Sequence, residues 1–130
     1  MKGVSLYKNA DLHCHSVVSD GTLTPEVLAA RAHANGVDLW ALTDHDEVGG
    51  QARALAAAQA LGMAYVSGVE ISVTFASATV HIVGLGFDAD NAAIQAGLAQ
   101  TRGGRGGRAQ EMAQGLAQVG ITGAYEGALK

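Results

Sequence analysis

Short apolar segments and longer amphipathic segments alternate along the first part of the chain. Residues 9–16 are strand-like and end in polar residues, and residues 37–43 are short and mostly apolar, as in a strand covered on both faces. Between them, Thr24 and Pro25 followed by an acidic residue favour the start of a helix, and Gly36 favours its end. The pattern predicts a β-α-β unit.

The same alternation continues further along the chain. Residues 50–61 are alanine-rich and are followed by a glycine, which predicts a second helix. Residues 64–74 predict a strand that bends at residues 67–68, and residues 76–78 predict a hairpin connection into a strand over residues 79–85. A hairpin beside parallel strands predicts a mixed sheet.

The last part of the chain has a helical pattern. Ile94 and Leu98 are four residues apart, as are Met112 and Leu116, and glycines separate the two pairs. We therefore expect two further short helices. Strands that alternate with helices predict an α/β fold with a largely parallel sheet, whose functional groups gather beyond the C-terminal ends of the strands. A closed eight-fold barrel needs about 250 residues, so 130 residues have room for only part of one.

The composition favours a globular protein, since 48% of the residues are hydrophobic and 15% are charged. The formal net charge of −4 argues against long-range capture of a polyanion unless bound cations reverse the local field. Cys14 is the single cysteine, so no internal disulfide can form. There is no basic-then-apolar leader and no apolar run of about 18 residues, and we expect a cytoplasmic protein without a membrane partner.

Histidines and acidic residues gather at the ends of the predicted strands. Residues i and i+2 of a strand point the same way, so His13 and His15 can offer two imidazoles to one ion while Cys14 points to the opposite layer. Imidazole suits zinc, manganese, iron or nickel, and carboxylates such as Asp20 and Glu70 shift the preference toward manganese. As an isolated pair, the two histidines would more often be surface or capping groups.

Two further positions strengthen the metal hypothesis. Residues 44–47 place three carboxylates and an imidazole directly after an apolar strand, where mutual repulsion favours a bound cation, although a solvated acidic turn is the alternative. Glu70 interrupts an apolar strand, and a buried unpaired carboxylate is unfavourable enough to require a metal or an arginine. His81 fits the same site or a hydrogen-bonded core position, whereas His33, within the first predicted helix, lies outside it.

Six short motifs carry a resemblance to a known family; they are residues 11–16, 19–21, 23–26, 43–46, 68–72 and 80–85. Together they resemble the N-terminal part of a PHP (polymerase and histidinol phosphatase) metal-dependent phosphoesterase. They are most similar to the branch that removes the 3′-phosphate from nucleoside 3′,5′-bisphosphates or trims short RNA from its 5′ end. The resemblance implies part of a distorted (β/α)7 barrel over residues 1–89 and the start of a helical insert over residues 90–130.

The resemblance also implies a site with a divalent metal cluster, manganese first, with zinc, iron or magnesium as alternatives. The implied metal ligands are His13, His15, Asp20, His45, Glu70 and His81. Glu70 would bridge two ions, and Asp44 and Asp46 would act in catalysis by orienting imidazoles or accepting protons. The family normally adds ligands further downstream, yet no histidine follows His81. We therefore expect a truncated chain with weak activity at best.

The implied reaction is hydrolysis of phosphate monoesters of small nucleotides, possibly of short RNA, by a metal-activated water. The alternative is a truncated or degenerate, non-catalytic module that binds metal or nucleotide. Arg102, Arg105 and Arg108 could contact a nucleotide phosphate, from one helix face or from a flexible loop, or lie in a solvated linker. The glycines between them each cost about 1 kcal/mol in a helix. A sheet edge exposed by truncation could pair with a second copy.

Overall fold

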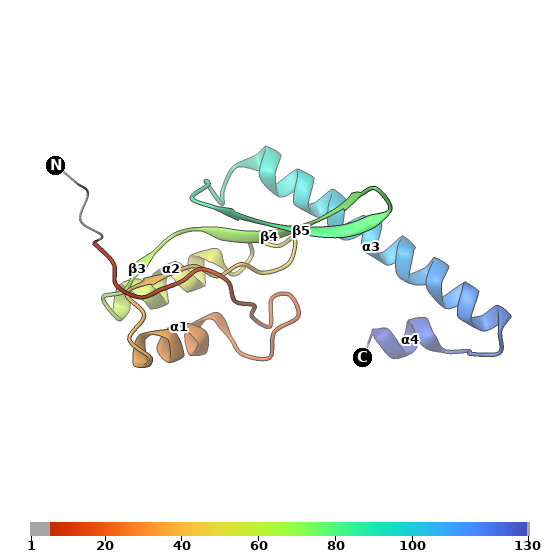
Figure 1. Cartoon of the computed structure of the whole chain (residues 1–130), viewed down its shortest axis with the longest axis horizontal. Coiled ribbons are helices and arrows are strands. Elements are labelled where there is room, and N and C mark those ends of the chain that lie inside the picture. Colours follow the sequence, from red (N-terminus) through yellow and green to blue (C-terminus); the bar gives the residue numbers. More distant parts are fainter. Residues whose placement is uncertain (1–5, 130) are drawn as a thin grey trace.

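The computed structural model describes residues 6–129, with the side chains of residues 105 and 106 left out (Figure 1). The elements in chain order are β1 (Ala10–Asp11), α1 (Pro25–Ala34), β2 (Leu39–Trp40), α2 (Gln51–Ala60), β3 (Ala64–Tyr65), β4 (Gly68–Phe75), β5 (Ala78–Leu85), α3 (Ala92–Gln118) and α4 (Ala124–Ala128). No helix of this described part is long and apolar enough to cross a membrane. The order of strands and helices is that of an α/β fold.

The three short strands β1, β2 and β3 form a parallel sheet in that order, as predicted for the first part of the chain. The regular ladder is shorter than residues 9–16 and 37–43 suggested. Beyond it, the amide of Ala41 donates to the carbonyl of Asp11, and the amide of Thr43 donates to that of Cys14. Between these two hydrogen bonds the chain after β1 passes three residues, from Asp11 to Cys14, and the chain after β2 passes two, from Ala41 to Thr43. One extra residue on one strand is the mark of a β-bulge. This irregularity ends the ladder where the histidines begin.

Helices α1 and α2 begin and end where their local sequence signals lie. Thr24 caps α1 by accepting a hydrogen bond from the amide of Val27, and Gly36 after it has a φ of 83°. Gly62, with a φ of 69°, ends α2 in the same way. The two helices pack on each other and on the sheet through small side chains such as Ala29, and the core between them includes the buried Trp40.

Strands β4 and β5 form an antiparallel hairpin, which confirms the predicted connection at residues 76–78. Ala76 and Ser77 both have positive φ angles, as in the tight turns that suit the twist of a hairpin. The hairpin is a separate two-stranded sheet, joined to the rest by one parallel bridge between His45 and Glu70. The single mixed sheet predicted from the sequence is therefore wrong.

The buried side chain of Gln51 explains the split between the two sheets. Its Nε2 donates to the carbonyl of Leu42 at 2.9 Å, and its Oε1 accepts from the amide of Gly68 at 3.1 Å and from the hydroxyl of Tyr65 at 2.5 Å. The side-chain amide of Gln51 thus makes the hydrogen bonds to the Leu42 carbonyl and the Gly68 amide that would otherwise join these two segments as neighbouring strands. Gly68 lies so close that a Cβ atom there would be 2.6 Å from the Leu42 carbonyl oxygen.

Helix α3 is continuous over 27 residues, so the prediction of two short helices with glycines between them is wrong. Asn91 caps it by accepting hydrogen bonds from the amides of Ala93 and Ile94. Glycines weaken a helix but keep their N–H donors, unlike proline, so they do not stop it. Leu98 is buried, whereas Met112 is 70% exposed. The second half of α3 runs away from the sheets toward α4 (Figure 1).

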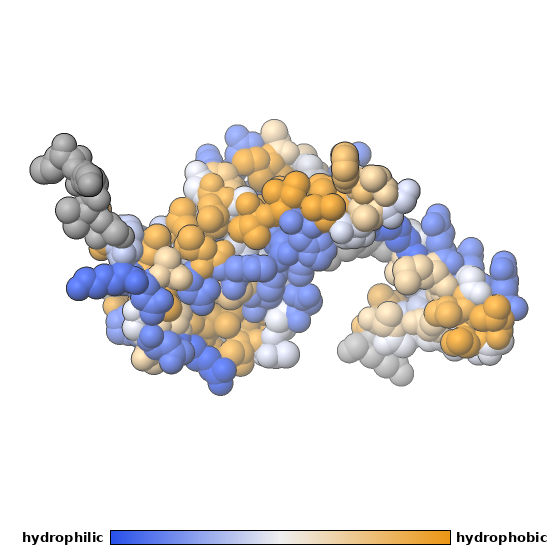
Figure 2. Space-filling view, viewed as in Figure 1, coloured by the Kyte–Doolittle hydropathy of each residue, from blue (hydrophilic) through white to orange (hydrophobic). Residues whose placement is uncertain are grey.

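The hairpin presents an apolar surface to solvent, visible in Figure 2 across the middle of the molecule. Phe75, Val80, Ile82, Val83 and Leu85 are each at least 40% exposed. Among residues 6–129, no strand pairs with the outer edge of β5. That a second copy pairs along this edge stays a prediction.

Because the side chain of Gln51 bonds Leu42 on one side and Gly68 on the other, its removal should lower the stability of the fold. Replacing it by leucine, Gln51→Leu, leaves the buried carbonyl of Leu42 and the buried amide of Gly68 without their partner, removes one partner of the half-buried Tyr65 hydroxyl, and should lower the free energy of unfolding by about 2–3 kcal/mol. Urea unfolding followed by circular dichroism measures this. The matched control is Gln59→Leu, an exposed glutamine of the same helix, which should change stability by less than about 0.5 kcal/mol. Equal losses in the two variants would contradict this account.

Candidate metal centre

The candidate centre lies where the C-terminal ends of β1 and β2 meet the hairpin. His13 and His15 follow β1, and His45 follows β2 and forms the bridge with Glu70 of β4. Glu70 is opposite Val83 in the hairpin, so His81 of β5 is its diagonal neighbour on the same face. The topology therefore brings four separate segments to one point.

Glu70 is the centre of the cluster, and its side chain is only 7% exposed. Its Oε2 lies 2.7 Å from Nε2 of His13 and 2.9 Å from Nε2 of His15, and its Oε1 lies 2.9 Å from Nδ1 of His81. Each carboxylate oxygen thus faces a different set of imidazoles. This is the geometry expected of a carboxylate that can serve two ions.

The remaining two predicted ligands complete the cluster. Nε2 of His45 lies 3.4 Å from Oδ2 of Asp20 and 3.9 Å from Oε2 of Glu70. The imidazoles of His15 and His45 are stacked with their centroids 4.4 Å apart. Three overlapping sets of three ligand atoms result, all within 4.8 Å of one another in each set; they are His13, His15 and Glu70; His15, Asp20 and His45; and His45, Glu70 and His81.

The donor chemistry of the cluster fits divalent ions. Imidazole nitrogens and carboxylate oxygens are ligands for manganese, iron and zinc. Nδ1 of His15 is buried, makes no hydrogen bond within the described part of the chain, and lies 3.7 Å from Oδ1 of Asp20. Such a nitrogen is available as a ligand. All six side chains that the sequence predicted as ligands therefore lie together.

The ionisation of Glu70 follows from its neighbours. Burial by itself raises the pKa of this carboxyl, but the hydrogen bond with His13 and the potential of the nearby imidazoles of His45, His13 and His15 outweigh it. The net effect holds the pKa of Glu70 below its usual range. The side chain is thus a carboxylate at neutral pH, the form that binds a cation.

Asp44, predicted to act in catalysis, is buried and holds a loop. Its Oδ1 accepts hydrogen bonds from the amide of Ser16 at 2.6 Å and the hydroxyl of Ser19 at 2.7 Å, and its Oδ2 accepts one from the hydroxyl of Ser16 at 2.7 Å. These bonds fix the loop between His15 and Asp20. Sequence reasoning missed both serines, although a buried aspartate requires donors of this kind.

Asp46, the second predicted catalytic acid, is also buried and connects the loop after β2 to the hairpin. Its amide donates to the carbonyl of Glu70 at 2.9 Å, and its Oδ1 accepts from the amide of Ser72 at 2.7 Å. Both contacts are with the strand that carries Glu70. Asp46 therefore aligns the backbone of His45 with β4.

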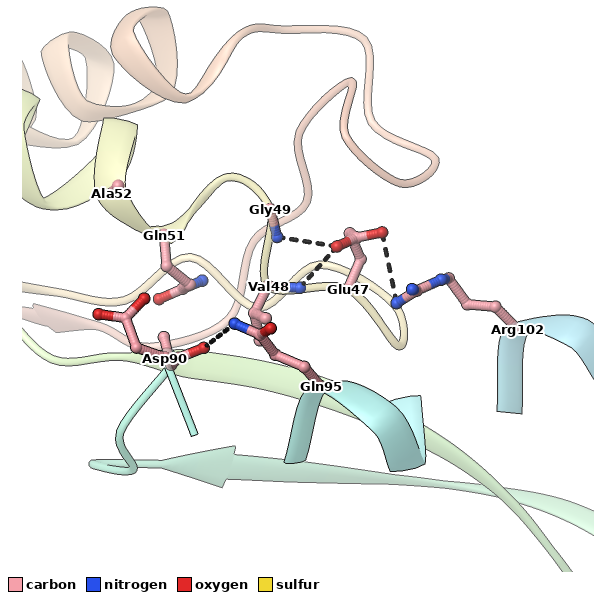
Figure 3. Close-up of a pocket in the computed structure, with 9 residues that line it drawn as sticks. Glu47, Val48, Gly49, Gln51, Ala52, Asp90, Gln95 and Arg102 are labelled. Atoms are coloured by element: carbon pink, nitrogen blue, oxygen red, sulfur yellow. Dashed lines mark hydrogen bonds and ion pairs between the residues drawn. The ribbon is translucent and has the colours of Figure 1, made fainter. Parts of the chain in front are cut away.

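The predicted substrate-binding arginines all belong to α3. Nη1 of Arg102 donates to the carbonyl of Asp46 at 2.5 Å and lies 3.4 Å from Oε2 of Glu47. Arg108 is exposed further along the helix, and the side chain of Arg105 lies outside the described residues. Arg102 also borders a pocket of about 360 Å³ with Glu47, Gln51, Asp90 and Gln95 (Figure 3). This pocket is lined by none of the six candidate metal ligands.

Cys14 and His33 behave as expected from the sequence. His33 is exposed on α1, outside the cluster. The side chain of Cys14 packs against the core, and its thiol donates to the carbonyl of Ala41 at 3.4 Å. Burial raises the pKa of this thiol to about 11. Its role is packing.

Comparison with known proteins gives a matching family and close relatives. Residues 11–119 match the sequence profile of the PHP domain. The 3′,5′-nucleoside bisphosphate phosphatase of Chromobacterium violaceum is 49% identical over 122 residues, which are 94% of this chain and 43% of that protein. A 5′-3′ exoribonuclease of Haemophilus influenzae is 44% identical over 121 residues, 93% of this chain and 44% of the relative.

Solved structures give the same result for the fold. An amidohydrolase of Chromobacterium violaceum, solved with sulfate and without metal, superposes with a TM-score of 0.84 at 49% identity, covering 94% of this chain and 43% of that one. A protein of Bifidobacterium adolescentis, provisionally named a metal-dependent phosphoesterase, gives a TM-score of 0.76 at 34% identity, with 85% and 39% covered. The chain spans less than half the length of these proteins.

The raised pKa of Cys14 predicts a slow thiol. A pKa of about 11 instead of the ordinary value of 9.0 leaves about 100-fold less thiolate at pH 8, because each pKa unit is a factor of ten. Alkylation by iodoacetamide, followed by mass spectrometry, should be slower by that factor than for the same chain unfolded in urea. The rate should keep rising until about pH 11 in the folded chain and level off near pH 9 in the unfolded one. Matching rates in both states would refute the packing role.

Proposed function

The chain belongs to the PHP-domain family, and on that premise we propose that it acts as a metal-dependent phosphoesterase on small nucleotides. The observation that carries the proposal is the carboxylate of Glu70, buried among imidazoles from three other segments. We take the 3′-phosphate of nucleoside 3′,5′-bisphosphates as the favoured substrate class and short RNA as the second, in line with the names of the two relatives. Residues 1–89 then belong to a barrel and residues 90–130 begin a helical insert.

In this proposal each overlapping ligand set holds one ion. The set of His13, His15 and Glu70 holds the first, that of His45, Glu70 and His81 the second, and that of His15, Asp20 and His45 the third. Manganese is the ion we favour, because carboxylates add hard oxygen ligands to the imidazoles. Bound divalent ions polarise a phosphoryl group and lower the pKa of a coordinated water.

The protein groups around the ligands have supporting tasks in the same proposal. Asp44 fixes the loop of Ser16 and Ser19, and so the separation of His15 from Asp20. Asp46 fixes the backbone after His45 against β4. Neither the mechanism nor the geometry requires Cys14, whose thiol is buried and protonated at neutral pH. The rigid support keeps the ligands converged on one small volume.

The metal part of the proposal is tested by titrating the whole chain with manganese, followed by electron paramagnetic resonance. The chain should bind more than one ion, and Glu70→Gln should weaken binding by at least about tenfold, because one carboxylate serves two ligand sets. His33→Ala removes an exposed imidazole outside the cluster and should bind like the unaltered chain. Equal affinities for Glu70→Gln and the unaltered chain would exclude the assigned site.

The activity part is tested by phosphate release from a nucleoside 3′,5′-bisphosphate. We expect release that requires manganese and that falls by about 100-fold or more in His15→Ala, since His15 lies in two of the ligand sets. His33→Ala should be as active as the unaltered chain. Tight nucleotide binding without metal dependence and without phosphate release would instead support the second candidate, a non-catalytic binding module.

A further inference from the structure

The long helix α3 contacts the loop beside the candidate centre through Arg102. Arg102 reaches from α3 to the loop that follows His45, where its Nη1 donates to the carbonyl of Asp46 at 2.5 Å. The same nitrogen lies 3.4 Å from Oε2 of Glu47, and Figure 3 shows this contact bridging the loop and the helix. Glu47 is itself held, because its Oε1 accepts from the amides of Val48 and Gly49.

The backbone at Asp46 has an unusual conformation. Its φ is 51°, in the left-handed region that residues other than glycine adopt uncommonly. Contacts with two other elements, β4 and α3, hold it there. The amide donates to Glu70 and the side chain accepts from Ser72, both in β4, whereas the carbonyl accepts from Arg102. Arg102 thus supplies a restraint that comes from outside the two sheets.

The residue held in this way is the direct neighbour of a candidate ligand. His45 contributes to two of the three ligand sets, with Asp20 and His15 on one side and with Glu70 and His81 on the other. The set of His13, His15 and Glu70 contains no residue of this loop. A shift of the Asp46 carbonyl would therefore displace His45 and disturb the two sets that contain it, but not the set of His13, His15 and Glu70.

We propose that Arg102 is a positioning residue that fixes the loop after His45, so that docking of α3 sets the metal affinity of the two sets containing His45. The inference rests on the proposed function, since it presumes that the ligand sets hold ions. It differs from the role of phosphate binding expected from the sequence, because the guanidinium is already engaged by Asp46 and Glu47. An arginine suits this task because its guanidinium is always charged, and here one of its nitrogens faces both acceptors.

The test compares Arg102→Gln and Arg102→Lys with the unaltered chain. In manganese titrations, Arg102→Gln should weaken manganese binding at the two sets that contain His45 by about tenfold. The affinity of the third set, His13 with His15 and Glu70, should stay unchanged. Arg102→Lys keeps the positive charge and an N–H donor, so its manganese affinity should lie between that of Arg102→Gln and that of the unaltered chain. Arg31→Gln, which removes an exposed arginine of α1, is the control for loss of charge and should match the unaltered chain.

A second readout needs no metal. Hydrogen exchange of the Asp46 amide, measured by NMR on the metal-free chain, should be about tenfold faster in Arg102→Gln, with other sheet amides unchanged. Unchanged exchange at Asp46, or equal affinity of every metal site in a folded Arg102→Gln chain, would overturn the inference. Absence of manganese binding by the unaltered chain would overturn the proposed function, while the exchange measurement would still decide the role of Arg102. A higher KM for nucleotide with unchanged metal affinity would show phosphate binding instead.

Discussion

Burial of one carboxylate is the constraint on which the rest of this structure depends. Glu70 lies in a strand beside the buried Val69, in a position where an isolated anion would be strongly unfavourable. Imidazoles from the ends of β1 and β2 and from β5 offset this cost at distances of 2.7–2.9 Å for His13, His15 and His81. The parallel sheet and the hairpin must therefore meet at this point for the chain to tolerate Glu70.

The junction between the two sheets is built from polar side chains rather than from a continuous ladder. Gln51 joins Leu42 to Gly68, Asp44 holds the loop before Asp20, and Asp46 joins the loop after β2 to β4. Buried polar groups of this kind specify one geometry when every member has its partners. The ligands emerge at this junction, so the features that separate the sheets also keep the ligands in place.

Local signals explain which parts of the structure the sequence could predict. Thr24, Gly36 and Gly62 mark helix ends through backbone chemistry that acts within a few residues, and the alternation of His13 and His15 depends only on strand geometry. The split between the sheets depends on Gln51, which stands in an alanine-rich helix without any local sign of its contacts. The continuity of α3 was missed because glycine propensity describes an isolated helix, whereas the cap at Asn91 and the burial of Leu98 help to fix its first turns.

The chain and its proposed phosphate substrate are both negatively charged, so the substrate could bind at the cluster only with the help of cations. The chain carries a formal charge of −4, and Asp20 and Glu70 place two carboxylates at the centre, so an approaching phosphate would meet a repulsive potential. Three divalent ions, one in each ligand set, would bring six positive charges against those two negative ones, and this would reverse the sign of the local field. The two carboxylates that oppose the approach of a phosphate are thus the same side chains that would hold the ions that attract it.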